Sequence, residues 1–261
     1  MTDFFRLRGK LPKKTVAVIE IIGLISIVLA WQGLCMTGWI NKGILPKPLA
    51  VVKSFHALWF ENALLKNTLH SLKLNVLGYL ESVVVAVPLG IFIGLISVVR
   101  AFSGRYIDAL RFLPLTAITG LFIAGFGIDD NMKIQFLAFG IGIYLLPTAV
   151  TRVLGVEDVY EQTAYTMGAT KWQMAKTVFI PAVLSRIFDD IRVLVAISWT
   201  YIIVAEMLNS TGGIGSISYL LARQGYYDRV FGILIVILLI GVAQDRLLVA
   251  LDKWLFKFKY A

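Results

Sequence analysis

Cysteine, histidine and charged residues are all scarce in this chain of 261 residues. One cysteine, Cys35, and two histidines, His56 and His70, are present. A single cysteine allows no internal disulfide and no cysteine cluster for zinc or for iron and sulfur. Charged residues make up 16% of the chain and hydrophobic residues 58%, so the polar surface is too small to cover a water-soluble globule. Lipid is therefore the expected solvent.

Catalytic and nucleotide-binding motifs are missing as well. The chain has no His-Glu-x-x-His pattern and no serine with a nearby histidine and aspartate in the context of a hydrolase. The glycine-rich residues 211–215 lack the Gly-x-x-x-x-Gly-Lys-Ser/Thr pattern, which excludes ATP binding in the P-loop manner. We therefore expect no metal and no cofactor in this chain, and an integral membrane enzyme is the less favoured alternative.

The positive charge of the chain does not indicate a nucleic-acid partner. The net charge is +9, but the Lys and Arg residues are scattered between apolar runs and form no single patch. The loops of a membrane protein explain this pattern, because they commonly carry an excess of Lys and Arg. We expect no nucleic acid to bind.

Long apolar runs are what the sequence has in abundance. A run of roughly 17 to 25 residues is long enough to cross a bilayer as a helix. The chain is therefore predicted to be an all-α, polytopic membrane protein, with a basic N-terminus over residues 1–15 and a transmembrane domain over residues 16–261. About six spans are expected, over residues 16–39, 71–99, 107–128, 134–154, 181–208 and 230–251.

The distribution of Lys and Arg predicts the orientation in the membrane. Basic residues between Arg6 and Lys14 precede the first apolar run, and most of the others fall in loops on the same side. The positive-inside rule then places both termini, and the loop over residues 156–180, in the cytoplasm. No small-x-small cleavage pattern follows the first run, so we interpret that run as an uncleaved anchor.

A polar stretch over residues 160–184 interrupts the apolar pattern. Residues 159–167 contain good helix formers without Pro or Gly, which predicts a short helix. Gly168 permits a left-handed turn at low cost, and residues 169–178 are expected to restart a helix. Pro181 has no amide hydrogen to donate, which suits the first turn of the next span. The expected structure is a helix, a sharp turn and a second helix, with an ordinary amphipathic surface helix as the alternative.

The same stretch resembles the cytoplasmic coupling loop of ABC-importer permeases, whose pattern is Glu-Ala-Ala, three residues, Gly, nine residues and Ile-x-Leu-Pro. Gly168 takes the glycine of that pattern, and Pro181 takes its proline at the expected spacing. The resemblance implies a type I ABC-importer permease fold and a loop that docks on a separate ATPase. The residues that it assigns to this ATPase-coupling contact are Glu161, Gln162, Thr163, Ala164, Gly168, Ala169, Val178, Ile180 and Pro181.

One position departs from the family pattern. The glutamate of the pattern falls on Gln162, while the nearby acid, Glu161, lies one residue earlier. In the family that glutamate typically pairs with a basic residue of the ATPase. Neighbouring residues point about 100° apart around a helix, so Glu161 and Gln162 do not face the same way. The sequence leaves both residues open as the contact, and we favour Glu161 at this point because an acid is the stronger partner for a basic residue.

Short segments elsewhere resemble the nitrate, sulfonate, taurine and bicarbonate branch of these permeases. Residues 125–128, 204–207, 213–215 and 222–224 match it in order around the loop. The resemblance implies that the chain forms the translocation pathway for a small solute, an anion such as nitrate, sulfonate, taurine or bicarbonate. Thr119 and Gly120 stand where relatives often carry Ile-Pro, which leaves the solute within the branch open.

The resemblance also implies a location and a set of partners. The chain is expected to be a multi-pass subunit of a prokaryotic inner membrane and not itself an enzyme. Its expected partners are a second permease copy in a homodimer, cytoplasmic ATPase subunits that bind the ATP, an extracytoplasmic solute-binding protein, and membrane lipid. An ATP-independent channel or secondary carrier is the alternative from another class, although no repeat of the first half is visible in the second.

A few polar or bulky residues inside the spans are candidates for the pathway. An ionisable group within a span is costly unless it faces a wet cavity or a partner, so Glu81 and Glu206 are candidates. Trp199 shares a helix face with Glu206, which suits pore lining or, as we favour, core packing. Gly90 and Gly94 lie four residues apart and are expected to let neighbouring helices approach closely. Ion pairs between helices are the expected role of Arg186, Asp189, Asp190 and Arg192.

Overall fold

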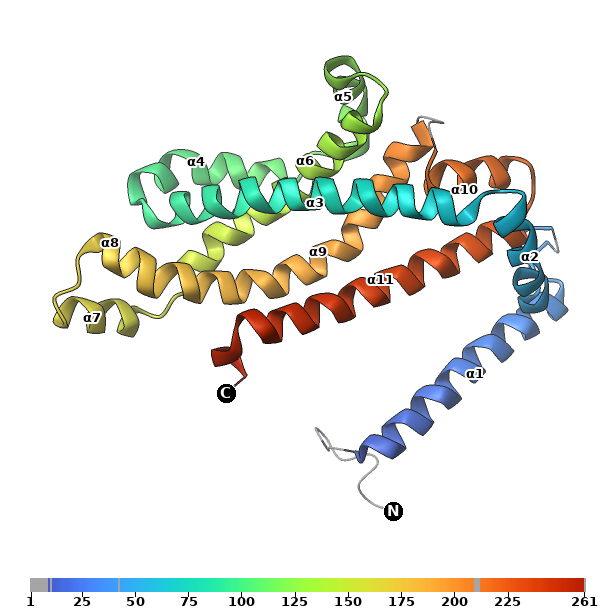
Figure 1. Cartoon of the computed structure of the whole chain (residues 1–261), viewed down its shortest axis with the longest axis horizontal. Coiled ribbons are helices and arrows are strands. Elements are labelled where there is room, and N and C mark those ends of the chain that lie inside the picture. Colours follow the sequence, from blue (N-terminus) through green and yellow to red (C-terminus); the bar gives the residue numbers. More distant parts are fainter. Residues whose placement is uncertain (1–8, 10, 42, 209–211, 261) are drawn as a thin grey trace. The chain divides into compact units, whose positions relative to one another are not determined.

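The computed structural model describes residues 9, 11–41, 43–208 and 212–260, and in these residues every regular element is a helix (Figure 1). Most of the basic N-terminus expected over residues 1–15 lies outside the described residues. The helices are α1 (Lys13–Thr37), α2 (Pro48–Phe60), α3 (Leu64–Leu95), α4 (Ser97–Leu110), α5 (Thr119–Phe126), α6 (Asp130–Leu154), α7 (Asp158–Thr166), α8 (Lys171–Met174), α9 (Ile180–Leu208), α10 (Ile214–Arg223) and α11 (Tyr227–Leu255).

Five helical segments of the described chain are long and apolar enough to cross a membrane. They are Lys13–Thr37, Leu64–Leu95, Asp130–Leu154, Lys171–Leu208 and Tyr227–Leu255. The pair α4 and α5 passes the same test only when the two helices are taken together, and the count is then six. The all-helical, multi-span architecture predicted from the apolar runs is therefore confirmed.

The third span differs from the straight helix expected over residues 107–128. Here α4 begins at Ser97 and ends at Leu110, and the chain turns by 93° before α5. Pro114 lies in the turn, where it lacks an amide hydrogen and disfavours a helical conformation of the residue before it. The apolar composition predicted a span here, and Pro114 within the run was a signal for the break that the prediction did not use.

The chain divides into two compact units. The first contains residues 1–62 and 220–234, and the second contains residues 63–219 and 235–261. In the first unit, the Trp31 indole donates a hydrogen bond to the Pro46 carbonyl at 3.0 Å and stacks on Phe231. In the same unit the Ser54 hydroxyl donates to the Asp228 carbonyl at 3.1 Å. These contacts join α1, α2 and the beginning of α11.

The second unit is built around α6, which packs against α3 on one side and α9 on another (Figure 1). A Cβ atom added to Gly90 would lie 2.8 Å from the Leu146 carbonyl oxygen, and one added to Gly94 would lie 2.7 Å from the Val153 Cβ. Such distances are too short for a side chain, so the two glycines permit the close approach of α3 and α6. The packing role predicted for Gly90 and Gly94 is confirmed.

Candidate functional site

The loop that precedes α9 contains the expected helix, turn and helix. Gly168 follows α7 with a φ of 78°, in the left-handed region. The Ala169 amide donates to the Ala164 carbonyl at 3.0 Å, and the Gly168 amide donates to the Tyr165 carbonyl at 2.9 Å. This pair of bonds is the Schellman ending of a helix. No atom lies within 4 Å of a Cβ built on Gly168, so the glycine is required by its φ and not by crowding.

The second helix of the loop begins with a capping box that was not predicted. The Gln173 amide donates to Thr170 Oγ1 at 3.3 Å, and the Thr170 amide donates to Gln173 Oε1 at 2.8 Å. The signal was present in the spacing Thr-x-x-Gln, which is typical of a helix N-terminus. Together the glycine turn and this cap fix where α7 ends and α8 begins.

The chain passes from α8 into the membrane helix α9 without a break. A π-helical turn over Ala175–Phe179 joins the two helices, and the Ile180 amide donates to the Ala175 carbonyl. Val178 lies in this turn, and Ile180 and Pro181 are the first residues of α9. Pro181 is therefore in the first turn of the helix, as predicted. A wide turn tolerates the missing amide hydrogen of Pro181, because the local hydrogen-bond pattern is already displaced.

The two residues that compete for the coupling contact occupy different faces of α7. Glu161 is half-buried and lines a cavity of about 890 Å³, together with Asp158, Tyr165 and Arg100. Gln162 is exposed, as is the neighbouring Thr163. Glu161 thus faces the ends of the membrane helices, whereas Gln162 faces away from them.

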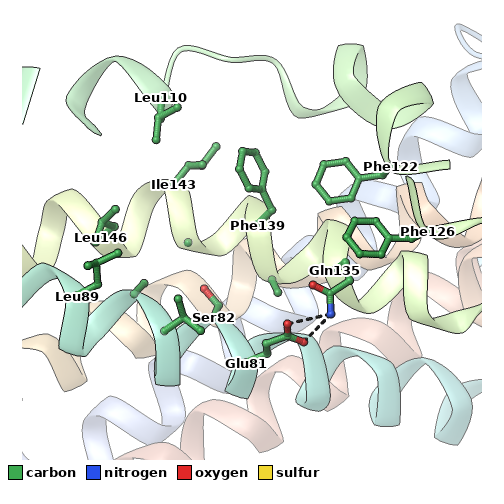
Figure 2. Close-up of a pocket in the computed structure, with 14 residues that line it drawn as sticks. Glu81, Ser82, Leu89, Leu110, Phe122, Phe126, Gln135, Phe139, Ile143 and Leu146 are labelled. Carbon is green, nitrogen blue, oxygen red and sulfur yellow. Dashed lines mark hydrogen bonds between the residues drawn. The ribbon is translucent and has the colours of Figure 1, made fainter. Parts of the chain in front are cut away.

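Glu81, one of the pathway candidates, lines a cavity of about 430 Å³ between α3, α5 and α6. Its carboxylate accepts two hydrogen bonds from Gln135 Nε2, at 2.9 and 3.0 Å (Figure 2). Figure 2 shows this pair near the rings of Phe122, Phe126 and Phe139. Gln135 was not among the residues expected to form a site, because its distance from Glu81 in the sequence gives no sign that the two side chains meet.

Glu206, the second candidate, is fully buried near the end of α9. Its carboxylate accepts hydrogen bonds from the Ser71 hydroxyl at 2.5 Å and from the Gly215 amide at 2.8 Å. The Ser71 oxygen also accepts a hydrogen bond from the Ile214 amide at 2.8 Å. Glu206 therefore holds the first residues of α10 against α3. It does not simply reach water, which was one expectation from its place at the end of the span.

Trp199 is buried as well, with 4% of its surface exposed. Its indole donates to Gln244 Oε1 of α11 at 2.7 Å, which supports the packing role that the sequence favoured. At the same end of α9 as the loop, Arg152 forms two hydrogen bonds of 2.7 Å with Asp190. Lys259 contacts Asp189 at 2.8 Å, and Arg192 contacts Asp245 at 3.0 Å. These ion pairs join separate helical segments, as expected for Asp189, Asp190 and Arg192. Arg186 differs from the expectation, because among the described residues its guanidinium donates to the Gly155 carbonyl and forms no ion pair.

Comparison with known proteins identifies the family of this chain. The family model for the inner membrane component of binding-protein-dependent transport systems matches residues 86–257, which is more than half of the chain. The chain belongs to this family. The match includes the whole loop over residues 156–180 and Glu206, whereas Glu81 lies just before it.

Curated relatives of this permease cover most of its length. A putative aliphatic sulfonates transport permease of Bacillus subtilis is 26% identical over 89% of this chain and 84% of its own length. A putative ABC transporter permease of Methanocaldococcus jannaschii is 32% identical over 84% of each chain. The taurine transport system permease of Escherichia coli is 25% identical over 80% of this chain and 78% of its own. These relatives confirm the predicted resemblance to the sulfonate, taurine and bicarbonate branch.

Solved structures of ABC importers share the fold of this permease. The inward-facing MetNI methionine ABC transporter matches with a TM-score of 0.66 and 15% identity, over 76% of this chain and 97% of that chain. A bacterial ABC transporter for the acidic polysaccharide alginate matches with a TM-score of 0.60 and 15% identity, over 92% of both chains. The chain is thus a non-catalytic membrane permease with the fold of ABC importers.

Proposed function

We propose that this permease is the pathway-forming subunit of an ATP-driven importer and that the loop around Gly168 is its contact with the ATPase. The observation that carries the proposal is the short helix α7, fixed by a glycine turn and followed by a helix that continues into α9. A force applied to α7 would be passed through the Gly168 turn to the continuous helical segment Lys171–Leu208, which contains a membrane helix. Such a loop suits a part that transmits motion.

The exposed face of α7 offers the surface for this contact. Gln162 and Thr163 are exposed on it, and apolar side chains accompany them: Val159 is 55% exposed, Tyr160 53% and Met167 82%. Exposed apolar residues beside polar ones are typical of a protein interface. Of the two alternatives left open by the sequence, we therefore favour Gln162 as the direct contact and assign Glu161 to the inner side of the loop.

The family and its relatives support the remaining partners and the class of solute. Two copies of the permease form the pathway, an external binding protein delivers the solute, and ATPase subunits bind the ATP. The relatives are named for aliphatic sulfonates, taurine and bicarbonate, which supports a small anionic or zwitterionic solute. The distribution of Lys and Arg supports cytoplasmic termini and a cytoplasmic loop, with the bent pair α4 and α5 counted as one span.

Substitutions of Gly168 test the coupling role. A φ of 78° strains a β-branched residue by about 1 kcal/mol or more, whereas Asn tolerates this region. In the reconstituted complex, Gly168→Val is expected to abolish ATPase association and ATP-driven uptake, and Gly168→Asn to retain most of both. The matched control is Gly23→Val, because Gly23 lies in α1 with no atom within 4 Å of its Cβ position. Uptake by Gly168→Val at the wild-type rate, or uptake without ATP, would contradict the proposal.

A further inference from the structure

The cavity beside Glu81 places a carboxylate among apolar side chains. Of the residues that line it, all within the described part of the chain, Glu81 is the one with an ionisable side chain. The other lining residues are mostly aliphatic or aromatic, with Gln135 and Ser82 as the polar exceptions. Glu81 is half-buried in α3, one of the candidate membrane spans. A carboxylate within such a span is costly unless it meets water, a partner or a ligand, so its presence needs an explanation.

Ion pairing does not explain the presence of this carboxylate. None of the ion pairs among the described residues includes Glu81. Its hydrogen-bond partner is the neutral amide of Gln135. A carboxylate offers about four lone-pair sites, and one amide nitrogen bonded to both oxygens leaves acceptor capacity free. Glu81 can therefore accept further hydrogen bonds from a molecule in the cavity.

The aromatic side chains around the same cavity are suited to a cation. The Phe122 ring lies 5.5 Å from the Phe139 ring and 5.9 Å from the Phe126 ring, measured between centroids. Phe122 and Phe126 belong to the short helix α5 that follows the 93° bend, so the bend brings their rings to α6. The face of an aromatic ring attracts a nearby cation. Rings beside a carboxylate favour a positively charged group and disfavour an anion.

Ser82 gives a second, independent sign that the cavity holds a ligand. Its residue is 3% exposed, and its hydroxyl has no hydrogen-bond partner among the described residues. Buried hydroxyl groups normally have a partner. Because Ser82 lines the same cavity as Glu81, a polar molecule there would satisfy both groups.

We propose that this cavity binds the nitrogen-bearing part of the solute, a protonated amine joined to a small apolar or aromatic group. The Glu81 carboxylate accepts hydrogen bonds from its N–H groups, and the three phenyl rings contact the ammonium group and the adjoining apolar part. As a step of import this rests on the proposed function, and it narrows the solute class. A zwitterion such as taurine carries an ammonium group that the carboxylate can bind, with its sulfonate outside the cavity, whereas bicarbonate, nitrate or an alkanesulfonate without an amine would meet the carboxylate with charge of the same sign.

Two probes that share a benzyl group and carry opposite charges test the binding itself. Benzylammonium and phenylmethanesulfonate are titrated against the purified full chain in nanodiscs of uncharged lipid, with empty nanodiscs as the blank. Wild-type protein is expected to bind benzylammonium at least about tenfold more tightly than phenylmethanesulfonate. A tenfold ratio of Kd values corresponds to about 1.4 kcal/mol, which is in the range of one cation–π contact. Equal affinities, tighter binding of the sulfonate, or no binding of either probe would overturn the proposal; the last result would leave a lipid chain as the occupant.

Matched variants connect the preference to the cavity. Glu81→Gln keeps the shape of the side chain and is expected to remove the preference for benzylammonium. Phe139→Leu is expected to weaken benzylammonium binding severalfold while keeping the preference. The control is Glu157→Gln, because Glu157 is exposed at the beginning of α7 and does not line the cavity. A full preference in Glu81→Gln would overturn the assignment.

Failure of this inference and failure of the proposed function give different results. If Gly168→Val uncouples the complex but the wild-type chain shows no preference between the probes, the proposed importer function is supported and the proposed ligand class is wrong. If the wild-type chain prefers benzylammonium while Gly168→Val transports normally, the cavity binds amines but the coupling role of the loop is wrong.

Discussion

At the beginning of α9, the loop around Gly168 is held in shape by its backbone, whereas at the end of α9 the connection to α10 is held by buried side chains. In the loop, the glycine turn and the Thr170 cap use main-chain groups and one short polar pair. At the other end, the Glu206 carboxylate and the Ser71 hydroxyl accept hydrogen bonds from the first backbone amides of α10. The two ends of one helix are thus fixed by different means.

The difference shows which end is available to a partner. Around Gly168 the side chains of Gln162, Tyr160 and Met167 stay exposed, because the backbone of the turn and the Thr170 cap fix the loop without them. Around Glu206 the polar side chains form hydrogen bonds within the chain, and Glu206 itself has no exposed surface. An exposed loop of defined shape suits docking, and a buried polar network suits a fixed joint.

The largest expected effect is at the fixed joint. Glu206→Ala leaves the Ser71 hydroxyl and the Gly215 amide without their acceptor, at a cost of about 3 kcal/mol in the free energy of unfolding. Glu206→Gln keeps one acceptor oxygen and is expected to cost less. Thermal unfolding of the purified protein measures both, with Glu157→Ala at an exposed position as the control. Equal stability of Glu206→Ala and wild type would show that α10 is held in another way.

Substitutions on the two faces of α7 should act on coupling without a large change in stability. Gln162→Ala is expected to lower ATP hydrolysis by the assembled complex roughly threefold to tenfold, the effect of one lost interface hydrogen bond. Glu161→Ala is expected to change it about twofold or less, as for a partly solvated charge. The reverse order would assign the contact to Glu161 and contradict the face that we favour.

A smaller effect is expected from the helix cap in the loop. Thr170→Ala removes the side-chain oxygen that accepts from the Gln173 amide, a loss of about 1 kcal/mol of local helix stability. Thr170→Ser keeps the hydroxyl and is the matched control. Hydrogen exchange of the amides in α8 should rise in the alanine variant alone. Unchanged exchange would mean that the glycine turn by itself fixes the start of this helix.

The parts of the site that depend on local residues were predictable from the sequence. The turn at Gly168 was predicted correctly because a glycine between two helix-forming stretches determines its own conformation. The long membrane helices followed from apolar composition in the same way. In both cases the determining residues are neighbours in the chain.

Features that depend on distant residues were not predictable. Ser71 and Glu206 are 135 residues apart, and Glu81 and Gln135 are 54 apart, so neither pair leaves a pattern in one sequence. The bend after α4 was missed because composition alone does not distinguish a straight run from a broken one, although Pro114 is a local signal that favours the break. Only the packing of α5 on α6 shows that the rings of Phe122 and Phe126 meet the cavity.

Cross-linking in the assembled complex tests most directly whether the exposed loop meets the ATPase. In a Cys35→Ser background, Met167→Cys presents a thiol at a position that is 82% exposed, and Tyr219→Cys presents one in α10, where Tyr219 is 42% exposed. A short thiol cross-linker is expected to join Met167→Cys to the ATPase subunit, with a yield that changes when ATP is added, and to leave Tyr219→Cys unjoined. Cross-linking of the ATPase to Tyr219→Cys but not to Met167→Cys in an intact complex would contradict the coupling role of the loop.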